Sequence, residues 1–168
     1  QPLLPVSSTK GQGITELKAE LSKLYNKNNT EDLEKAFRLN VDRSFTLKGF
    51  GTVVTGTVLC GLTNKDEELV QYPQQRNIRI RGLHTQGKNV NEVFVGQRAA
   101  LNLVGIAKEE IQRGDQLAKK NSLITSYILN ATFYLLNEVS APLKNRTRIR
   151  LFLGSKEVFG RIIILEDS

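Results

Sequence analysis

The chain of 168 residues carries 24 Lys and Arg against 17 Asp and Glu, a formal net charge of +7. This charge favours an anionic partner, with nucleic acid first; ordinary surface charge is the alternative, because charged residues make up an average 24%. A hydrophobic content of 39% supports a folded core. The single cysteine, Cys60, excludes an internal disulfide, and with the single histidine, His84, it gives no metal cluster. No apolar run approaches a membrane span and no signal-peptide pattern opens the chain, so we expect a cytoplasmic protein without a membrane partner.

Residues 1–35 are predicted to hold a loop, one helix and a linker. The loop VSSTKGQG at residues 6–13 precedes apolar residues at helical spacing, namely Ile14, Leu17, Leu21 and Leu24. The polar run at residues 26–32 is typical of a linker. Because the apolar stripe of the helix needs a partner surface, we interpret residues 1–35 as the end of a larger upstream domain.

From residue 36 onward, β-strand signals dominate. The segment Val41–Gly61 is dense in Val and Thr and is interrupted by glycines, which favours a strongly bent strand in a small closed barrel. A single helical turn is expected at Lys108–Ile111. The predicted strands are Ala36–Val41, Gly51–Cys60, Glu68–Gln71, Asn77–His84, Val90–Val95, Arg98–Val104 and Gln116–Lys119. So many short strands in sequence predict one barrel over residues 36–122.

Residues 123–168 are predicted to form a separate β unit. Strands are expected near Ser126–Leu136, Thr147–Leu153 and Glu157–Leu165. Three strands are few for an independent sheet, so this unit is interpreted as part of a domain. Exposed strand edges could then pair with a second copy of the chain.

Three near-matches to nucleotide-binding motifs fail. The run GLHTQGKN at Gly82–Asn89 has Asn where a phosphate-binding loop needs Ser or Thr, and a strand follows it. Gly49–Gly51 lacks the third glycine of a dinucleotide fingerprint, and Asn64–Glu67 ends in Glu where a guanine motif needs Asp. The only histidine has no nucleophile motif beside it. We therefore predict no catalytic residues in this chain.

Two rows of arginines alternate with other residues, which places each row on one strand face. One row is Arg79 and Arg81, and the other is Arg146, Arg148 and Arg150. A row of guanidinium groups suits a phosphate backbone. A solvated outer face is an equally good interpretation.

The run G-x-G-T-V-V-T-G at Gly49–Gly56 resembles the second domain of translational GTPases. Further segments resemble the selenocysteine-specific elongation factors, the SelB family, and together they cover essentially the whole chain. These segments are Val41–Arg43 with Phe45, Gly82–His84 with Gln86, Gly96–Arg98 with Ala100–Asn102, Ala141–Leu143, Leu151–Gly154 and Gly160–Arg161. The resemblance implies a mainly β fold: an elongation-factor-type Greek-key β-barrel (domain 2), a partial second β-barrel (domain 3) and an N-terminal helix from the GTPase domain. Asp66 stands where the family commonly has glycine; aspartate tolerates the left-handed turn expected there.

The resemblance also implies which activities this chain lacks. Ser7 and Ser8 match the base-contacting position of the family's last guanine motif, whereas the phosphate loop and switch regions have no counterpart. We expect no enzyme activity and no cofactor in this chain, with GTP and Mg belonging to the parent protein. The winged-helix modules that read an mRNA hairpin have no counterpart either. Implied partners are selenocysteyl-tRNA and the ribosome, in UGA-directed selenocysteine incorporation.

The resemblance implies a pocket for the esterified amino acid at Asp42, Arg43 and Arg98. In elongation factor Tu the position matching Arg43 is acidic, and the position matching Arg98 is an asparagine. In this chain, the two arginines would donate charge-assisted hydrogen bonds to a selenolate. Asp42 would hold the arginines or meet the substrate ammonium. An ordinary surface ion pair is the alternative for Asp42 and Arg43.

His84 aligns with a position that lies against the terminal adenosine of tRNA, although a structural role is equally plausible for it. Arg146, Arg148 and Arg150 are implied contacts to the tRNA backbone. Two other functions stay open at this point: a fragment of a general elongation factor, and an RNA-binding barrel without amino-acid selectivity.

Overall fold

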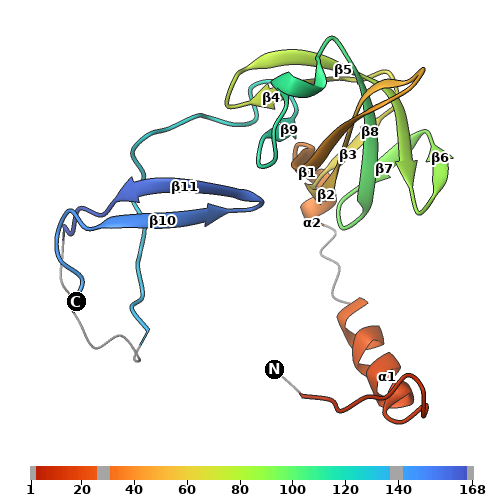
Figure 1. The fold of residues 1–168 in the computed structure, drawn as a ribbon, viewed down its shortest axis with the longest axis horizontal. Helices are drawn as coiled ribbons and strands as arrows, with labels where there is room; N and C mark the ends of the chain where they lie inside the picture. Colours follow the sequence, from red (N-terminus) through yellow and green to blue (C-terminus); the bar gives the residue numbers. More distant parts are fainter. Residues whose placement is uncertain (1–2, 26–30, 137–141, 166–168) are drawn as a thin grey trace.

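The structure is a computed structural model that describes residues 3–25, 31–136 and 142–165 (Figure 1). The helices are α1 (Ile14–Tyr25), α2 (Glu31–Glu34) and the 3₁₀ turn η1 (Lys108–Glu110). The strands are β1 (Arg38–Leu47), β2 (Gly51–Cys60), β3 (Leu62–Asn64), β4 (Glu68–Tyr72), β5 (Arg76–Thr85), β6 (Lys88–Val90), β7 (Glu92–Phe94), β8 (Arg98–Val104), β9 (Gln116–Ala118), β10 (Arg148–Leu153) and β11 (Lys156–Arg161).

Six strands close into a barrel. The sheet runs in the order β4-β9-β1-β2-β8-β5, and β4 also pairs with β5, which completes the ring. Every pairing is antiparallel, and the short strand β6 pairs with the end of β5 outside the ring. β3 and β7 form a separate two-stranded sheet beside the barrel. The predicted β-barrel is therefore confirmed.

The barrel is filled by apolar side chains that point inward from every strand of the ring. Fully buried members include Leu39, Val54, Leu69, Leu101 and Leu117. Alternation along a strand sends the neighbours of these residues outward. The core therefore fixes which side chains the barrel presents on its outer surface.

Besides a register shift at the start of β1, between Arg38 and Leu39, two β-bulges change that alternation. The β1–β2 register shifts between Val41 and Arg43, so Asp42 is the extra residue. The β5–β8 register shifts between Ile80 and Gly82, so Arg81 is the extra residue. A bulge inserts one residue and redirects the side chains that follow it. After each bulge, residues that strict alternation would bury face outward.

The strand predictions differ from the structure at several ends. β2 matches its prediction, whereas β1 runs to Leu47 instead of ending at Val41. The predicted strand Val90–Val95 is divided into β6 and β7, which pair with different strands. β3 was not predicted. The turn residue Asp66 has φ +69°, the left-handed conformation expected there.

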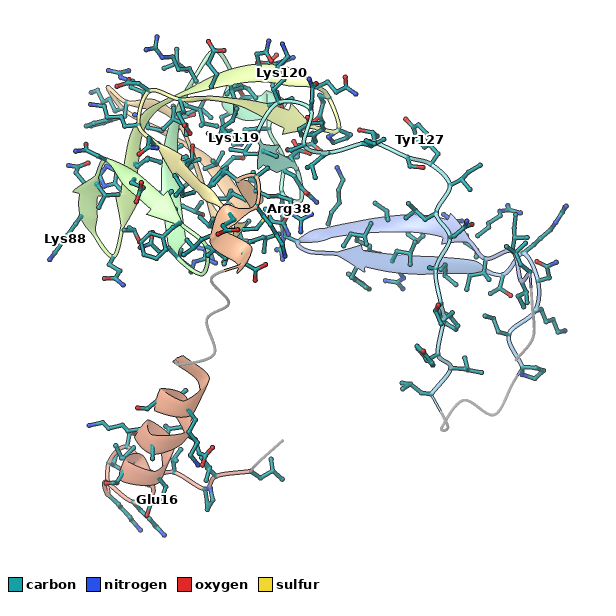
Figure 2. All side chains as sticks on the ribbon, turned by 180° about the vertical axis from the view of Figure 1, so that it is seen from behind. Glu16, Arg38, Lys88, Lys119, Lys120 and Tyr127 are labelled. Carbon is teal, nitrogen blue, oxygen red and sulfur yellow. The ribbon has the colours of Figure 1, made fainter. Side chains whose placement is uncertain are left out.

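The described residues between positions 123 and 165 contain one hairpin, β10–β11, instead of the three predicted strands. The predicted strand Ser126–Leu136 is wrong: the chain lies there without a ladder partner among the described residues, and strands persist only when a neighbour pairs with their backbone groups. Tyr127 in this segment is fully exposed and points away from the chain (Figure 2). β11 ends at Arg161, short of the predicted Leu165.

The helix α1 lies apart from the barrel (Figure 1). Its boundaries agree with the predicted periodicity. Leu21 is 53% exposed, whereas Ile14 and Leu17 are half-buried, so the apolar stripe of α1 is only partly covered. No helix in the described ranges is long and apolar enough to cross a membrane.

Candidate functional site

An open groove of about 840 Å³ lies on the outer surface of the barrel. It is lined by β1, β2, β5, β8 and the loop before β9. The lining residues are Asp42, Arg43, Thr55, His84, Thr85, Gln86, Gly87, Arg98, Ala99, Ala100 and Arg113. The groove thus brings together four residues that the sequence singled out: Asp42, Arg43, His84 and Arg98.

The floor of the groove is a row of residues that crosses four adjacent strands. Arg43 is opposite Thr55, Thr55 is opposite Ala100, and Ala100 is opposite His84. Side chains directly opposite each other share one face of a sheet. The two middle residues are small, so the row is low in the centre and bounded by a guanidinium and an imidazole. Three inter-strand steps of about 4.8 Å separate these two ends.

Both ends of this row depend on the bulges. Leu39 and Val41 point into the core, so strict alternation would send Arg43 inward as well. The extra residue Asp42 turns Arg43 outward. On β5, Arg81 has the same effect, because Leu83 becomes the buried residue and His84 faces the groove.

Asp42 forms an ion pair with Arg98. A guanidinium nitrogen of Arg98 lies 2.7 Å from the Asp42 Oδ2, and the same nitrogen is 3.4 Å from the Thr57 hydroxyl. The Arg98 side chain is 63% exposed and that of Asp42 is 30% exposed. A pair this exposed contributes at most about 1 kcal/mol to stability. Its clearest effect is to hold the Arg98 guanidinium over the groove.

The groove is cationic. Arg43, Arg98 and Arg113 bring three positive charges, and Asp42 is the single carboxylate among the lining residues, so these four side chains sum to a net charge of +2. A concave surface lined by one sign of charge concentrates ligands of the opposite sign. The groove is therefore suited to an anionic group, with one carboxylate placed to meet a cation beside it.

Arg113 is a lining residue that was not predicted from the sequence. It lies in the loop before β9, which reaches the groove because β9 pairs with β1, Asn40 opposite Gln116. Its Nε donates to the backbone oxygen of Ser155 at 3.2 Å. The only local signal was the Gly114–Asp115 turn that follows it. The neighbourhood of Arg113 and Asp42 arises from barrel closure, which spacing along the sequence does not reveal.

The arginines of the β10–β11 hairpin lie outside the groove lining. Arg148 and Arg150 share one face of β10, as predicted. Arg146 does not belong to that row: it lies in the turn before β10 with φ +63°, where its amide donates to the Ile162 oxygen at 2.8 Å. The Arg148 guanidinium lies 4.5 Å from the centre of the Phe159 ring, and Arg150 is 3.5 Å from Glu157.

The remaining predicted residues also lie outside the groove lining. Arg79 and Arg81 are both exposed on β5, and the Arg79 Nε donates to the backbone oxygen of Asp66 at 3.3 Å. Ser7 and Ser8 lie in the loop before α1, where the Ser7 hydroxyl accepts the Lys10 amide at 3.3 Å. In the described part of the chain, no three His, Cys, Asp or Glu side chains come together to hold a metal ion.

Two carboxylates with lowered pKa values are both found away from the groove. Partial burial raises the pKa of Glu67, but hydrogen bonds from Lys119, the Thr63 hydroxyl and the Asn64 amide outweigh this and lower it. The Ala107 amide, and then Arg76, lower the pKa of Glu110. Both groups tie loops to the barrel, so we interpret them as structural.

Comparison with known proteins is consistent with this geometry. Residues 51–118 match the family described as elongation factor Tu domain 2. The selenocysteine-specific elongation factor of Desulfomicrobium baculatum is 38% identical over 168 residues, 98% of this chain and 26% of that protein. The corresponding factor of Escherichia coli strain K12 is 32% identical over 169 residues, 99% of this chain and 26% of that protein.

A solved structure shows the same likeness. The crystal structure of a bacterial selenocysteine-specific elongation factor, EF-Sec, matches with a TM-score of 0.81 at 29% identity, over 96% of this chain and 27% of that chain. The chain spans about a quarter of the length of the curated relatives it matches. The chain therefore belongs to the family of selenocysteine-specific elongation factors, and its barrel is the elongation factor Tu domain 2 of that family.

Proposed function

We propose that the groove binds the aminoacyl end of selenocysteyl-tRNA and selects the selenolate with Arg43 and Arg98. The observation that carries this proposal is the convergence of Asp42, Arg43, Arg98 and His84 on one concave, cationic surface. Two of these residues reach the surface only through bulges, which are typical of sites where a side chain must be redirected. The chain would take part in translation as a binding unit of a longer elongation factor.

The chemistry of the selection is electrostatic. A selenol is more acidic than a thiol or a hydroxyl, so selenocysteine enters the groove as an anion. Two guanidinium groups supply charge-assisted hydrogen bonds to it, and these are about twice as strong as neutral ones. Serine brings a neutral hydroxyl, which leaves the positive charge that Asp42 does not balance in the groove without a counter-charge. The Asp42 carboxylate is placed to receive the α-ammonium of either amino acid.

The size of the preference follows from exposure. Hydrogen bonds to charged groups contribute about 1.5–3 kcal/mol. Arg98 is 63% exposed, so solvent screening places its contribution at the low end of that range. We expect Arg98 to account for about a tenfold preference for selenocysteyl-tRNA over seryl-tRNA.

Other residues are assigned to the rest of the tRNA. His84, at the far end of the row, would stack on or hydrogen-bond to the terminal adenosine. Arg113, which lines the groove from the loop before β9, would neutralise a phosphate near the terminal adenosine of the tRNA. Arg148 and Arg150 would contact the backbone further along, with Arg146 beside them in the turn. These contacts position the tRNA, whereas the groove arginines distinguish its amino acid.

We also propose the division of the chain into residues 1–35, 36–122 and 123–168. The barrel ends at Ala118 in β9, which supports the boundary near residue 122. The first unit, with Ser7 and Ser8 in its guanine-motif loop, would complete a GTP- and Mg-binding domain, and the last would complete a second barrel. The longer factor would act with the ribosome in the cytoplasm, and further modules would read the mRNA hairpin.

The test measures equilibrium binding of the 168-residue chain to one tRNA body charged with selenocysteine or with serine. We expect the wild-type chain to prefer the selenocysteyl form, Arg98→Ala to reduce the preference about tenfold, and Arg79→Ala to preserve it. Arg79 is the matched control because it is an exposed barrel arginine outside the groove lining and outside both bulges. An unchanged preference in Arg98→Ala would refute the assignment.

Cysteine on the same tRNA offers a second, independent comparison. Its thiol titrates near pH 8.5, so it is mostly neutral at pH 6.5 and half ionised at pH 8.5. If the groove recognises the anion, cysteinyl-tRNA binds more tightly at the higher pH and seryl-tRNA does not. Equal pH responses of the two ligands would show that the groove does not sense charge on the side chain.

The second candidate function is RNA binding without amino-acid selectivity. It is favoured by the exposed arginines outside the groove, Arg79 and Arg81 on the barrel and Arg148 and Arg150 on the hairpin. Such a protein would bind charged and uncharged tRNA equally, with an affinity that falls steeply as salt increases. Equal binding of both aminoacyl forms in the experiment above would favour this candidate.

A further inference from the structure

The tip of the β10–β11 hairpin is seated on the barrel directly beside the groove. The hydroxyl of Ser155, at the tip, donates to the backbone oxygen of Val41 at 2.8 Å. The same oxygen accepts the amide of Gly114 at 2.8 Å, and the amide of Val41 donates to the oxygen of Asp115 at 2.9 Å. The backbone of Val41 is therefore held by the loop before β9 and by the hairpin together.

The Val41 carbonyl belongs to the peptide unit that begins the Asp42 bulge. A peptide unit is planar, so fixing its oxygen also fixes the orientation of the Asp42 amide. This orientation sets the direction in which the bulge sends the Asp42 and Arg43 side chains. The Ser155 hydroxyl is thus one peptide away from the residues that form one wall of the groove.

Ser155 also reaches a second wall. Its backbone oxygen accepts the Nε of Arg113 at 3.2 Å, and Arg113 is a lining residue of the groove. One hairpin residue therefore holds two groove elements that are about seventy positions apart in the sequence. It does so without lining the groove itself.

The seat of the hairpin tip is narrow. A Cβ added at Gly114 would come within 2.3 Å of the Lys156 Cβ, and one added at Gly154 would come within 2.0 Å of the side-chain nitrogen of Asn40, Nδ2. The Lys156 ammonium lies 3.4 Å from the fully buried carboxylate of Asp115. Close packing at Gly114 and Gly154 and a charge pair at Lys156 hold the backbone of the hairpin tip in place, whereas the Ser155 side chain itself is half-buried.

We infer that Ser155 is a positioning residue for amino-acid selection: it fixes the Asp42 bulge and Arg113, so that the hairpin contributes to the selectivity of a groove it does not line. The effect of Ser155 on amino-acid selection rests on the proposed function, whereas its positioning of the Asp42 bulge and Arg113 is independent of any ligand. The hairpin also carries Arg148 and Arg150. Any force that moves the hairpin therefore changes the geometry of the groove.

The binding test compares Ser155→Ala with Ser155→Thr, which keeps the hydroxyl, and with Ser122→Ala. Ser122 is the matched control because its hydroxyl donates to the Lys119 carbonyl at an exposed site outside the groove lining. We expect Ser155→Ala to lower the ratio of selenocysteyl-tRNA to seryl-tRNA affinity about fivefold, the effect of one neutral hydrogen bond. Ser155→Thr and Ser122→Ala should retain the ratio. A purely structural loosening would weaken both ligands equally and leave the ratio unchanged, which would overturn the inference.

A second readout needs no tRNA. In ¹H–¹⁵N spectra of the 168-residue chain, Ser155→Ala should shift the amide of Asp42 and the Nε–H of Arg113, while Ser155→Thr and Ser122→Ala leave both near their wild-type positions. Unchanged signals in Ser155→Ala would overturn the positioning role. If these signals respond but the wild-type chain shows no preference between the two tRNAs, the positioning stands and the proposed function fails.

Discussion

Gly56 in β2 is a position where one added methyl group should strongly destabilise the barrel. It faces inward opposite Val41 and Ala99. A Cβ at Gly56 would lie 2.0 Å from the backbone oxygen of Asn40 and 2.8 Å from a methyl of Leu39. Real Cβ contacts are essentially never closer than 3.0 Å, so β1 and β2 would have to separate by about 1 Å.

The cost of Gly56→Ala can be worked from this displacement. Overpacking of a filled core costs about 1–3 kcal/mol. Moving two paired strands apart also weakens one or two backbone hydrogen bonds, each worth about 1 kcal/mol. The loss of chain entropy in the unfolded state returns only about 0.4–1 kcal/mol. We expect Gly56→Ala to lower the free energy of unfolding by about 2–4 kcal/mol, which would lower the Tm by more than about 10 °C.

Urea unfolding followed by far-UV circular dichroism measures this change, and Gly82→Ala is the matched control. Gly82 is also a barrel glycine in a strand, but a Cβ there would meet nothing closer than 3.9 Å. The control should therefore unfold within about 1 kcal/mol of the wild type, on the stable side. If the two variants are equally stable, close strand approach is not the reason for glycine at position 56.

Three further results are expected. Asp115 is fully buried and accepts hydrogen bonds from Gln71 at 2.7 Å and the Gln112 amide at 3.0 Å. Asp115→Ala should therefore lower the free energy of unfolding, measured in urea, by about 3 kcal/mol. The control Asp32→Ala removes an exposed ion pair with Lys35 and should lower it by less than about 0.5 kcal/mol. Because the pKa of Glu67 is lowered in the folded state, the stabilisation that Glu67 provides is present above its ordinary pKa of 4.5 and is lost as the pH falls below that value. Glu67→Gln should therefore make the free energy of unfolding fall less steeply as the pH is lowered below 4.5. An unchanged pH dependence would contradict the Lys119 contact. The exposed apolar segment 124–136 and the open edges of the hairpin should produce concentration-dependent self-association, which sedimentation velocity detects and a monomer at all concentrations would exclude.

The parts of the fold that depend on local pattern could be predicted from the sequence. β2 was predicted with its observed bounds because its Val and Thr run lies between glycines that end the ladder on both sides. The mainly β class and the family are confirmed for the same reason: the glycine-rich run and the segments around it are specific. The strand Ser126–Leu136 was predicted on composition alone, and apolar composition does not supply a pairing partner.

The candidate site was predictable in its residues but not in its geometry. Asp42, Arg43, Arg98 and His84 came from the family resemblance, and the structure places all four in one groove. Alternation counted from the buried residues of β1 and β5 would have turned Arg43 and His84 into the core. Bulges depend on pairing with other strands, so their positions cannot be counted along one strand. Arg113 was missed for a related reason, since barrel closure brings it there.

The two bulges have a consequence for how relatives of this chain should be compared. Deleting one residue at position 42 or 81 would restore regular pairing and leave the core residues before it unchanged. The same deletion would leave Arg43 or His84 on the outer face, because Arg43 would then directly follow the buried Val41 and His84 would still follow the buried Leu83. Regular pairing at the present strand length would instead turn Arg43 or His84 toward the barrel interior, so a relative can retain both residues in its sequence and still have no groove. For this site, the pairing register of two strands is as informative about function as the identity of the residues on them.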